Sequence, residues 1–189
     1  SFNRITVDGD TSTNDACMLV ASGASGVKVS EREPELLAAM TDLINEVFLD
    51  LAQAIVRDGE GATKFVEVAV CGAKSSEEAL KVAYTVAESP LVKTALFASD
   101  PNWGRILAAI GRAGIEGLDV SGVQVHLGDV LIADKGGRAA SYTEEAGAAV
   151  MKQEEIVIAI DLGRGDVAET VWTTDFSYDY VKINAEYRS

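Results

Sequence analysis

The stretch Asp58-Gly59-Glu60-Gly61-Ala62-Thr63-Lys64 lies where the hydrophobic pattern of the chain changes its period. Before it, over residues 35–57, apolar residues recur at three- and four-residue spacing, which predicts one long amphipathic helix. After it, over residues 65–71, valines alternate with other side chains as they do in a strand. Because two glycines relieve the backbone of steric limits, the junction can turn tightly. The sequence therefore predicts a helix and a strand joined by a short exposed turn that carries Glu60.

Glu60 has two interpretations on these residues alone. In the first, its carboxylate points into a cleft, with Thr63 and Lys64 beside it. In the second, Gly59 ends the helix and Glu60 is a solvated acid in an ordinary turn. Acids flanked by glycine are common in turns, so the local sequence favours the second interpretation.

The rest of the chain mixes helical and strand patterns. Further helices are predicted over 75–88, 106–112 and 143–152, and further strands over 16–21, 123–127, 130–133, 156–162 and 167–174. Residues 91–98 are apolar and stay open between helix and strand. Strict alternation of strand and helix is missing from this order. We therefore expect one α/β domain of the layered α+β kind over residues 1–189, with a mixed sheet or sheets covered by helices.

The connections and the tail have their own signals. Residues 8–15 are rich in hydroxyls and acids and are expected to form a structured loop; their oxygens suit a cation, but the spacing of a calcium loop is missing. Residues 135–138 are expected to form a loop. Residues 163–166, Gly-Arg-Gly-Asp, predict a hairpin between the last two strands. The aromatic side chains near Tyr178 and Tyr180 predict that the tail packs onto the body instead of fraying.

Composition limits the classes of function. The 189 residues are 48% hydrophobic and carry a formal net charge of −14. This charge disfavours nucleic acid and anionic membranes as partners, because both select basic surfaces. The sequence shows neither an apolar run of about 18 residues, as a membrane helix needs, nor a signal-peptide pattern. We therefore expect a cytoplasmic protein.

Few residues suit metal or nucleophilic chemistry. Cys17 and Cys71 stand alone in apolar surroundings and are expected to be buried free thiols in a reducing compartment. The single histidine, His126, lies in a strand pattern, so a zinc site or a Ser-His-Asp relay has little to build on. We expect no metal and no cofactor.

Five stretches, spread from one end of the chain to the other, resemble a single family. They are residues 2–15 (FNRITVDGDTSTND), 60–64 (EGATK), 89–95 (SPLVKTA), 100–105 (DPNWGR) and 184–187 (NAEY). Together they resemble the C-terminal (β) chain of the ornithine acetyltransferase family, the bifunctional glutamate N-acetyltransferases of arginine biosynthesis. The fold expected from the resemblance is the layered α/β fold of that family.

The resemblance implies a reaction and a partner. Family members cut themselves into α and β chains just before a threonine, which becomes the N-terminal nucleophile of the β chain. This threonine takes an acetyl group from N-acetylornithine and gives it to glutamate in a ping-pong cycle through an acetyl-enzyme. Bifunctional members also accept acetyl-CoA. Whether this protein does so stays open at the level of sequence. An N-terminal amine can act as the base for its own hydroxyl. The implied partner is the α chain, in an α2β2 assembly.

Three residues are carried over from the family as substrate-binding residues. Glu60 matches the glutamate of Glu-Gly-Ala-Thr-Lys, Asn184 matches the substrate-binding asparagine, and Ser189 matches the last residue of the family's tail. A carboxylate can hold an ornithine amine, and an amide or hydroxyl can hold a carboxylate. Residues 100–105 are typical of the family, but we expect them to cap and pack a helix. The alternative is that Arg105 clamps a carboxylate.

The chain departs from the family at its start. It begins at Ser1-Phe2, whereas the β chain of the family begins with the nucleophilic threonine. The resemblance places that threonine upstream of Ser1, so no catalytic residue is expected in this chain, which alone should be inactive. Ser1 as the nucleophile is the less favoured alternative. Two other readings stay open: a non-catalytic domain that binds ornithine or glutamate, and a purely structural subunit. If an α chain covers one face, this chain should expose apolar surface.

Overall fold

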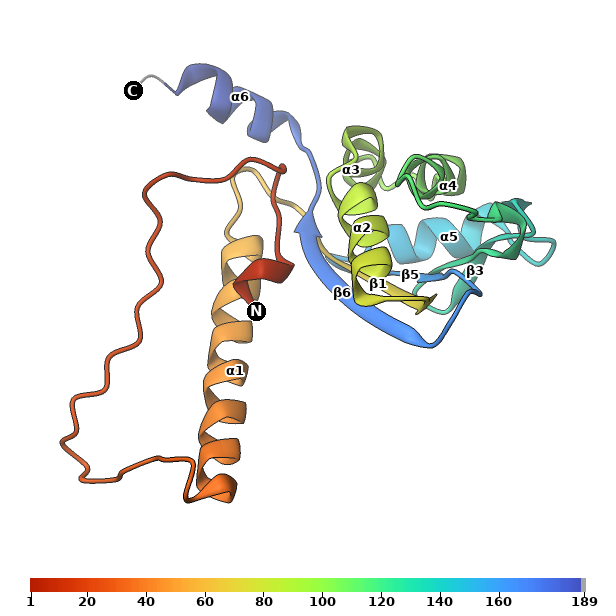
Figure 1. Ribbon diagram of the computed structural model, residues 1–189. Coiled ribbons are helices and arrows are strands. Elements are labelled where there is room, and N and C mark those ends of the chain that lie inside the picture. Colours follow the sequence, from red (N-terminus) through yellow and green to blue (C-terminus); the bar gives the residue numbers. More distant parts are fainter. Residues whose placement is uncertain (188–189) are drawn as a thin grey trace.

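The computed structural model describes residues 1–187 (Figure 1). The helices are η1 Phe2–Arg4, α1 Pro34–Arg57, α2 Ser76–Ala87, α3 Pro90–Phe97, α4 Trp103–Gly111, η2 Val120–Gly122, α5 Glu144–Met151 and α6 Tyr178–Glu186. The strands are β1 Phe65–Ala73, β2 Gln124–Leu127, β3 Val130–Asp134, β4 Gly137–Arg138, β5 Glu155–Asp161 and β6 Val167–Thr174.

The strands form a mixed sheet in the order β4-β3-β2-β5-β1-β6. The pair β1–β5 is parallel, and the other neighbouring pairs are antiparallel. Along β1, Val66, Val68 and Val70 are buried, while the side chains between them stay partly exposed. The core lies on the buried face, between the sheet and helices α2 to α5. The expected layered α/β fold is confirmed.

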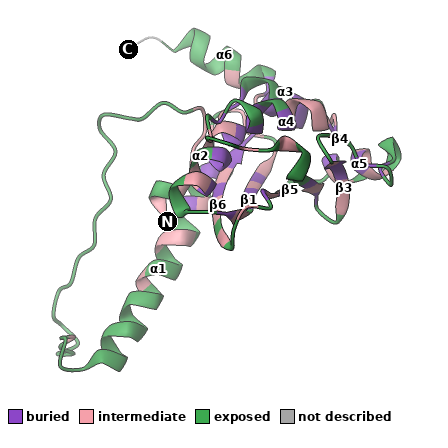
Figure 2. Ribbon diagram, turned by 45° about the vertical axis from the view of Figure 1, so that its right-hand side comes forward, coloured by how far each residue is buried: buried purple, intermediate pink, exposed green. Residues whose placement is uncertain are grey.

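The first third of the chain is built differently. Between Thr6 and Glu33 the chain forms no helix or strand, and it arcs away from the sheet alongside α1 (Figure 1). Helix α1 is exposed over most of its length, as Figure 2 shows. Phe48 packs on the ring of Phe2, but much of the apolar stripe is uncovered: Leu43 is 56% exposed and Leu51 is 51% exposed. The predicted exposed apolar surface is therefore present.

Two sequence predictions about strands are wrong. Residues 16–21 are not a strand; they are an exposed irregular segment, with Met18 80% exposed. A strand needs a neighbour to bond, and the described chain offers none there. Strands β5 and β6 do not form a hairpin, because β1 lies between them. Their connection crosses the end of β1 instead, where the backbone N–H groups of Arg164 and Gly165 donate to the carbonyl of Gly72.

Other segments also differ from expectation. The ambiguous residues 91–98 are mostly helix α3, and the predicted loop 135–138 contains the short edge strand β4. Cys17 and Cys71 are free, as expected, but exposed, so their predicted burial is wrong. The tail forms α6, which buries no residue; Tyr178 is 83% exposed. Tyr180 packs as predicted, stacked on the ring of Phe176 with ring centroids 4.4 Å apart, and Tyr178 meets the ring of Phe97 edge-on at 5.3 Å.

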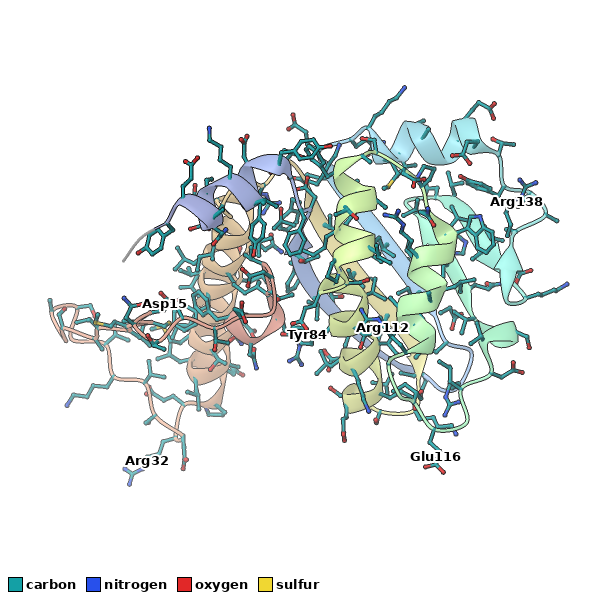
Figure 3. All side chains as sticks on the ribbon, turned by 90° about the horizontal axis from the view of Figure 1, so that it is seen from above. Asp15, Arg32, Tyr84, Arg112, Glu116 and Arg138 are labelled. Atoms are coloured by element: carbon teal, nitrogen blue, oxygen red, sulfur yellow. The ribbon has the colours of Figure 1, made fainter. Side chains whose placement is uncertain are left out.

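The N-terminal segment and the sheet body meet near Tyr84 of α2. In Figure 3, Asp15 and Arg32 lie on one side of the molecule, Arg112 and Glu116 lie on the other, and Tyr84 lies between them. The Tyr84 hydroxyl donates to the carbonyl of Asn3 over 3.0 Å. Among residues 1–187, no helix has the length and apolar character that crossing a membrane demands.

Candidate functional site

The turn that carries Glu60 is tight and close to helix α6. Helix α1 ends at Arg57, and the N–H of Ala62 donates to the carbonyl of Gly59 over 3.0 Å, which closes the turn. Gly61 has φ +66°, a conformation that side chains rarely adopt. A Cβ on Gly61 would also collide with the backbone of Tyr180 and approach the Ser177 hydroxyl to 2.8 Å. Glycine is required here because two backbones meet.

A buried carboxylate holds the second half of the turn. Asp175, 1% exposed, lies just after β6. Its Oδ1 accepts from the backbone N–H of Thr63 at 2.8 Å and of Lys64 at 3.0 Å, and its Oδ2 accepts from the Thr63 hydroxyl at 2.6 Å. The Thr174 hydroxyl donates to the same Oδ1 over 3.1 Å. Hydrogen bonds to an ionised acceptor are the stronger kind, so this carboxylate fixes the turn to the end of the sheet.

Ser177 connects the turn to the start of α6. Its hydroxyl donates to the carbonyl of Gly61 over 2.6 Å and accepts from the N–H of Tyr180 over 3.1 Å. The second bond is an ordinary helix N-cap, which satisfies one of the free N–H groups of the first turn. One side chain therefore starts α6 and sets its distance from Glu60.

Glu60 and Asn184 meet across this junction. The Asn184 amide donates to Glu60 Oε2 over 2.8 Å and to the carbonyl of Tyr180 over 3.0 Å. Both side chains are exposed, so the pair sits on an open surface of this chain. The structure thus brings together two of the three residues expected to bind substrate. The third, Ser189, lies outside the described residues.

Acidic groups surround the pair. The Tyr180 hydroxyl donates to Asp8 Oδ2 over 2.9 Å. Burial, the bond to Asp8, and the charges of Asp8, Asp10 and Glu60 raise the pKa of Tyr180 to about 12. The carboxylates of the N-terminal loop and of the turn therefore lie close enough together to act on the same hydroxyl group. A negative potential of this kind attracts a cationic ligand such as an amine.

Beneath the site lies a lysine that the sequence did not mark as functional. Lys93 of α3 is fully buried, and its ammonium donates to Thr173 Oγ1 over 2.8 Å and to the carbonyl of Thr174. The same group lies 4.7 Å from the centroid of the Phe176 ring. Burial lowers the pKa of Lys93 to about 7, although the carboxylates of Asp175, Asp8 and Glu88 favour the charged form.

Sequence reasoning missed Asp8, Asp175, Ser177 and Lys93 as parts of one arrangement. Tyr180 and Asn184 are four residues apart on α6, a spacing that places them on one helix face. That spacing signals a shared face only where the tail is helical, and the sequence pattern predicts no helix there. The contacts of Asp175 with Thr63 and of Lys93 with Thr173 join residues 112 and 80 positions apart, and no local pattern encodes them.

Residues 100–105 have the capping role that the sequence predicts. The Asn102 side chain caps α4 by accepting from the N–H of Arg105 over 3.1 Å, and its amide donates to Asp100 over 3.0 Å. The Arg105 guanidinium donates to the carbonyl of Leu91 and to the Thr94 hydroxyl, which joins α4 to α3. These bonds give Arg105 a structural role, and none of them involves Glu60.

The chain is similar to known proteins over its whole length. A family model described as the ArgJ family matches residues 1–189. The arginine biosynthesis bifunctional proteins ArgJ of Pseudomonas fluorescens, Pseudomonas syringae pv. tomato and Psychrobacter arcticus are 65%, 61% and 60% identical to the chain over 190 aligned residues. Each alignment covers 100% of this chain but 47% of the relative, so the chain spans about half the length of the curated relatives it matches.

The fold leads to the same result. The crystal structure of the arginine biosynthesis bifunctional protein ArgJ from Bacillus halodurans matches with a TM-score of 0.91 at 39% identity, covering 99% of this chain and 87% of that one. The mixed sheet with its Glu60 turn thus has the same α/β fold as that protein. The chain belongs to the ArgJ family.

Proposed function

We propose that the protein to which this chain belongs is a cytoplasmic acetyltransferase of arginine biosynthesis that moves an acetyl group from N-acetylornithine to glutamate. Membership of the ArgJ family and the names of the relatives support this proposal. The observation that carries it is the 2.8 Å hydrogen bond between Asn184 and Glu60, which joins two family-typical segments 124 residues apart.

In this proposal the chain supplies substrate recognition. The Glu60 carboxylate binds the ammonium group of ornithine, helped by the charges of Asp8 and Asp10. The Asn184 amide turns from Glu60 to the substrate carboxylate, and the hydroxyl of Ser189 is a further ligand for it. A carboxylate paired with an amide on an open surface is suited to an amino acid, which carries both charges.

The chemical step uses a threonine upstream of Ser1. Its hydroxyl oxygen attacks the acetyl carbonyl of N-acetylornithine while its own N-terminal amine takes the hydroxyl proton. The amide C–N bond breaks, ornithine leaves as the amine after receiving that proton, and the acetyl group stays on the threonine as an ester. The amine of glutamate then attacks the ester and restores the hydroxyl. Acetyl-CoA is a candidate second donor to the same threonine.

The proposed partner is the α chain made by self-cleavage of the precursor, in an α2β2 assembly. The chain is about half as long as its relatives. The exposed apolar face of α1 is the surface on which the other half can pack. A hollow of about 980 Å³ lies between the N-terminal segment and α1, lined by residues that include Cys17, Met18 and Leu51. We propose that the α chain fills this hollow and covers the exposed side chain of Met18.

Intact mass spectrometry of the full-length, two-chain protein tests the function. After incubation with N-acetylornithine, the β chain should gain the mass of one acetyl group, and added glutamate should remove it. A Glu60→Gln variant should acquire the same adduct only at higher donor concentration, because it loses an ammonium ligand but keeps the nucleophile. A two-chain wild-type protein that stays unmodified at saturating donor contradicts the proposal.

A further inference from the structure

We propose that Asp175 is a positioning residue for substrate binding: its buried carboxylate sets the placement of Glu60 against Asn184. This inference rests on the proposed function of that pair. Asp175 follows the last residue of β6 directly and precedes the Ser177 cap of α6 by two residues. It is therefore on the same short segment that launches the helix carrying Asn184.

The same carboxylate holds the segment that carries Glu60. Both backbone N–H groups that follow the turn, at Thr63 and Lys64, donate to Asp175, and the Thr63 hydroxyl does so too. Asp175 is thus the polar link between the two segments on one side of the pair, and the Ser177–Gly61 bond is the link on the other. With both in place, hydrogen bonds to buried or half-buried groups hold the backbone segments that carry Glu60 and Asn184, while the two side chains stay free to turn.

Lys93 makes this burial of charge tolerable. A lone buried carboxylate is costly, whereas a nearby cation offsets its charge. The Lys93 ammonium bonds the two residues before Asp175, Thr173 and Thr174, and the Lys93 carbonyl accepts from the N–H of Phe176 over 3.2 Å. Helix α3 therefore holds Asp175 from both sides along the chain. The exposed Glu60–Asn184 pair is thereby supported by a buried set of hydrogen bonds.

A double-mutant cycle on the full-length, two-chain protein tests the assignment. Glu60→Gln, Asp175→Ala and the double variant are compared for KM and kcat with N-acetylornithine, at a temperature well below the melting point of each. If Asp175 acts through Glu60, each single variant raises KM, with a loss in kcat/KM of about 100-fold for Asp175→Ala. The double variant then loses little more than the worse single variant, because residues that act as one unit are not additive.

Glu78→Ala is the matched control. Glu78 forms a partly buried pair with Arg164, with side chains 11% and 12% exposed, beside the opposite end of β1. Combined with Glu60→Gln, its effects should multiply. If the effects of Asp175→Ala multiply in the same way, Asp175 is only structural and the inference fails while the Glu60 site stands. If Glu60→Gln alone changes neither KM nor kcat, it is the proposed site that fails.

Two milder variants keep the test decisive if Asp175→Ala does not fold. Thr63→Val removes one donor to Asp175 and should lower kcat/KM by about 10-fold. Asp175→Asn keeps an oxygen for the two backbone N–H groups and should retain more activity than Asp175→Ala. Both should be non-additive with Glu60→Gln. Additive behaviour in these two cycles overturns the inference as firmly as it would in the first.

Discussion

At the scale of single residues, Lys93 couples the stability of the fold to pH. Its pKa is about 7 in the folded chain and 10.5 when unperturbed. Between these values the unfolded chain binds more protons than the folded chain, so the free energy of unfolding rises with pH. Below pH 7 both states are charged, and the full cost of burying the ammonium is present.

We therefore expect the free energy of unfolding of the wild type to increase from pH 7 to pH 9, by up to about 1.4 kcal/mol per pH unit from this group. A Lys93→Met variant removes the titrating amine and should show a flatter profile over the same range. Urea titrations of both proteins at several pH values measure the difference. Parallel profiles would show that Lys93 is charged throughout.

Gly61 is the residue where the two halves of the site touch. Gly61→Ala should destabilise the protein by about 1–2 kcal/mol for the left-handed backbone and about 1–3 kcal/mol more for the collision with α6. Gly117→Ala is the control, because Gly117 has φ +64° and nothing within 4 Å of its added Cβ. Thermal unfolding should separate the two variants. Equal melting temperatures would mean that the contact with α6 is loose.

At the scale of elements, helix α1 is held by little in this chain. Leu43 and Val47 on its apolar stripe are 56% and 47% exposed. Replacing both by Asp should therefore change the stability of the chain alone by less than about 0.5 kcal/mol each. In the two-chain protein the same pair should be buried, and the substitution should prevent the α and β chains from co-purifying. Glu46→Lys, on the same helix, is a charge-changing control that should leave co-purification intact.

Elements with strong local signals were predictable from the sequence. The three- and four-residue period of the apolar residues predicts α1. The change to an alternating pattern after the Gly59–Lys64 turn predicts β1, and the structure confirms both elements. The order of strands was not predictable, because Gly163-Arg164-Gly165-Asp166 looks like a hairpin whether or not β1 enters between its strands. Residues 16–21 show the same limit. Their pattern predicts a strand, but pairing depends on a neighbour that the local sequence does not specify.

The candidate site was predictable to a different extent. The turn residues alone favour a solvated acid at Glu60. Only the resemblance to a family predicts that Glu60 and Asn184 belong to one site. Their hydrogen bond agrees with that joining, and their role in binding remains a proposal. The supporting contacts of Asp175 and Lys93 link residues 80 or more positions apart. Such contacts follow from the tertiary fold and leave no periodic trace.

At the scale of the whole molecule, the two parts of the chain have different dependence on a partner. The sheet and α2 to α5 enclose their own core, whereas the 28 residues from Thr6 to Glu33 contain no helix or strand. Loops longer than about 15 residues are uncommon in compact domains unless they have a function or a partner. The net charge of −14 is a second global property, since it favours the approach of cations at low salt, among them the ornithine proposed as the ligand.

The position of β1 in the sheet also decides when, during synthesis, the Glu60 turn can be held in place. Its two neighbours, β5 and β6, begin at residues 155 and 167, and the helix opposite Glu60 begins at 178. A ribosome adding about 5–20 residues per second must therefore reach Asp175 and α6 before the Glu60 turn meets the groups that hold it. A nascent chain without residues 175–186 would have most of its core but a Glu60 turn that lacks its hydrogen-bond partners.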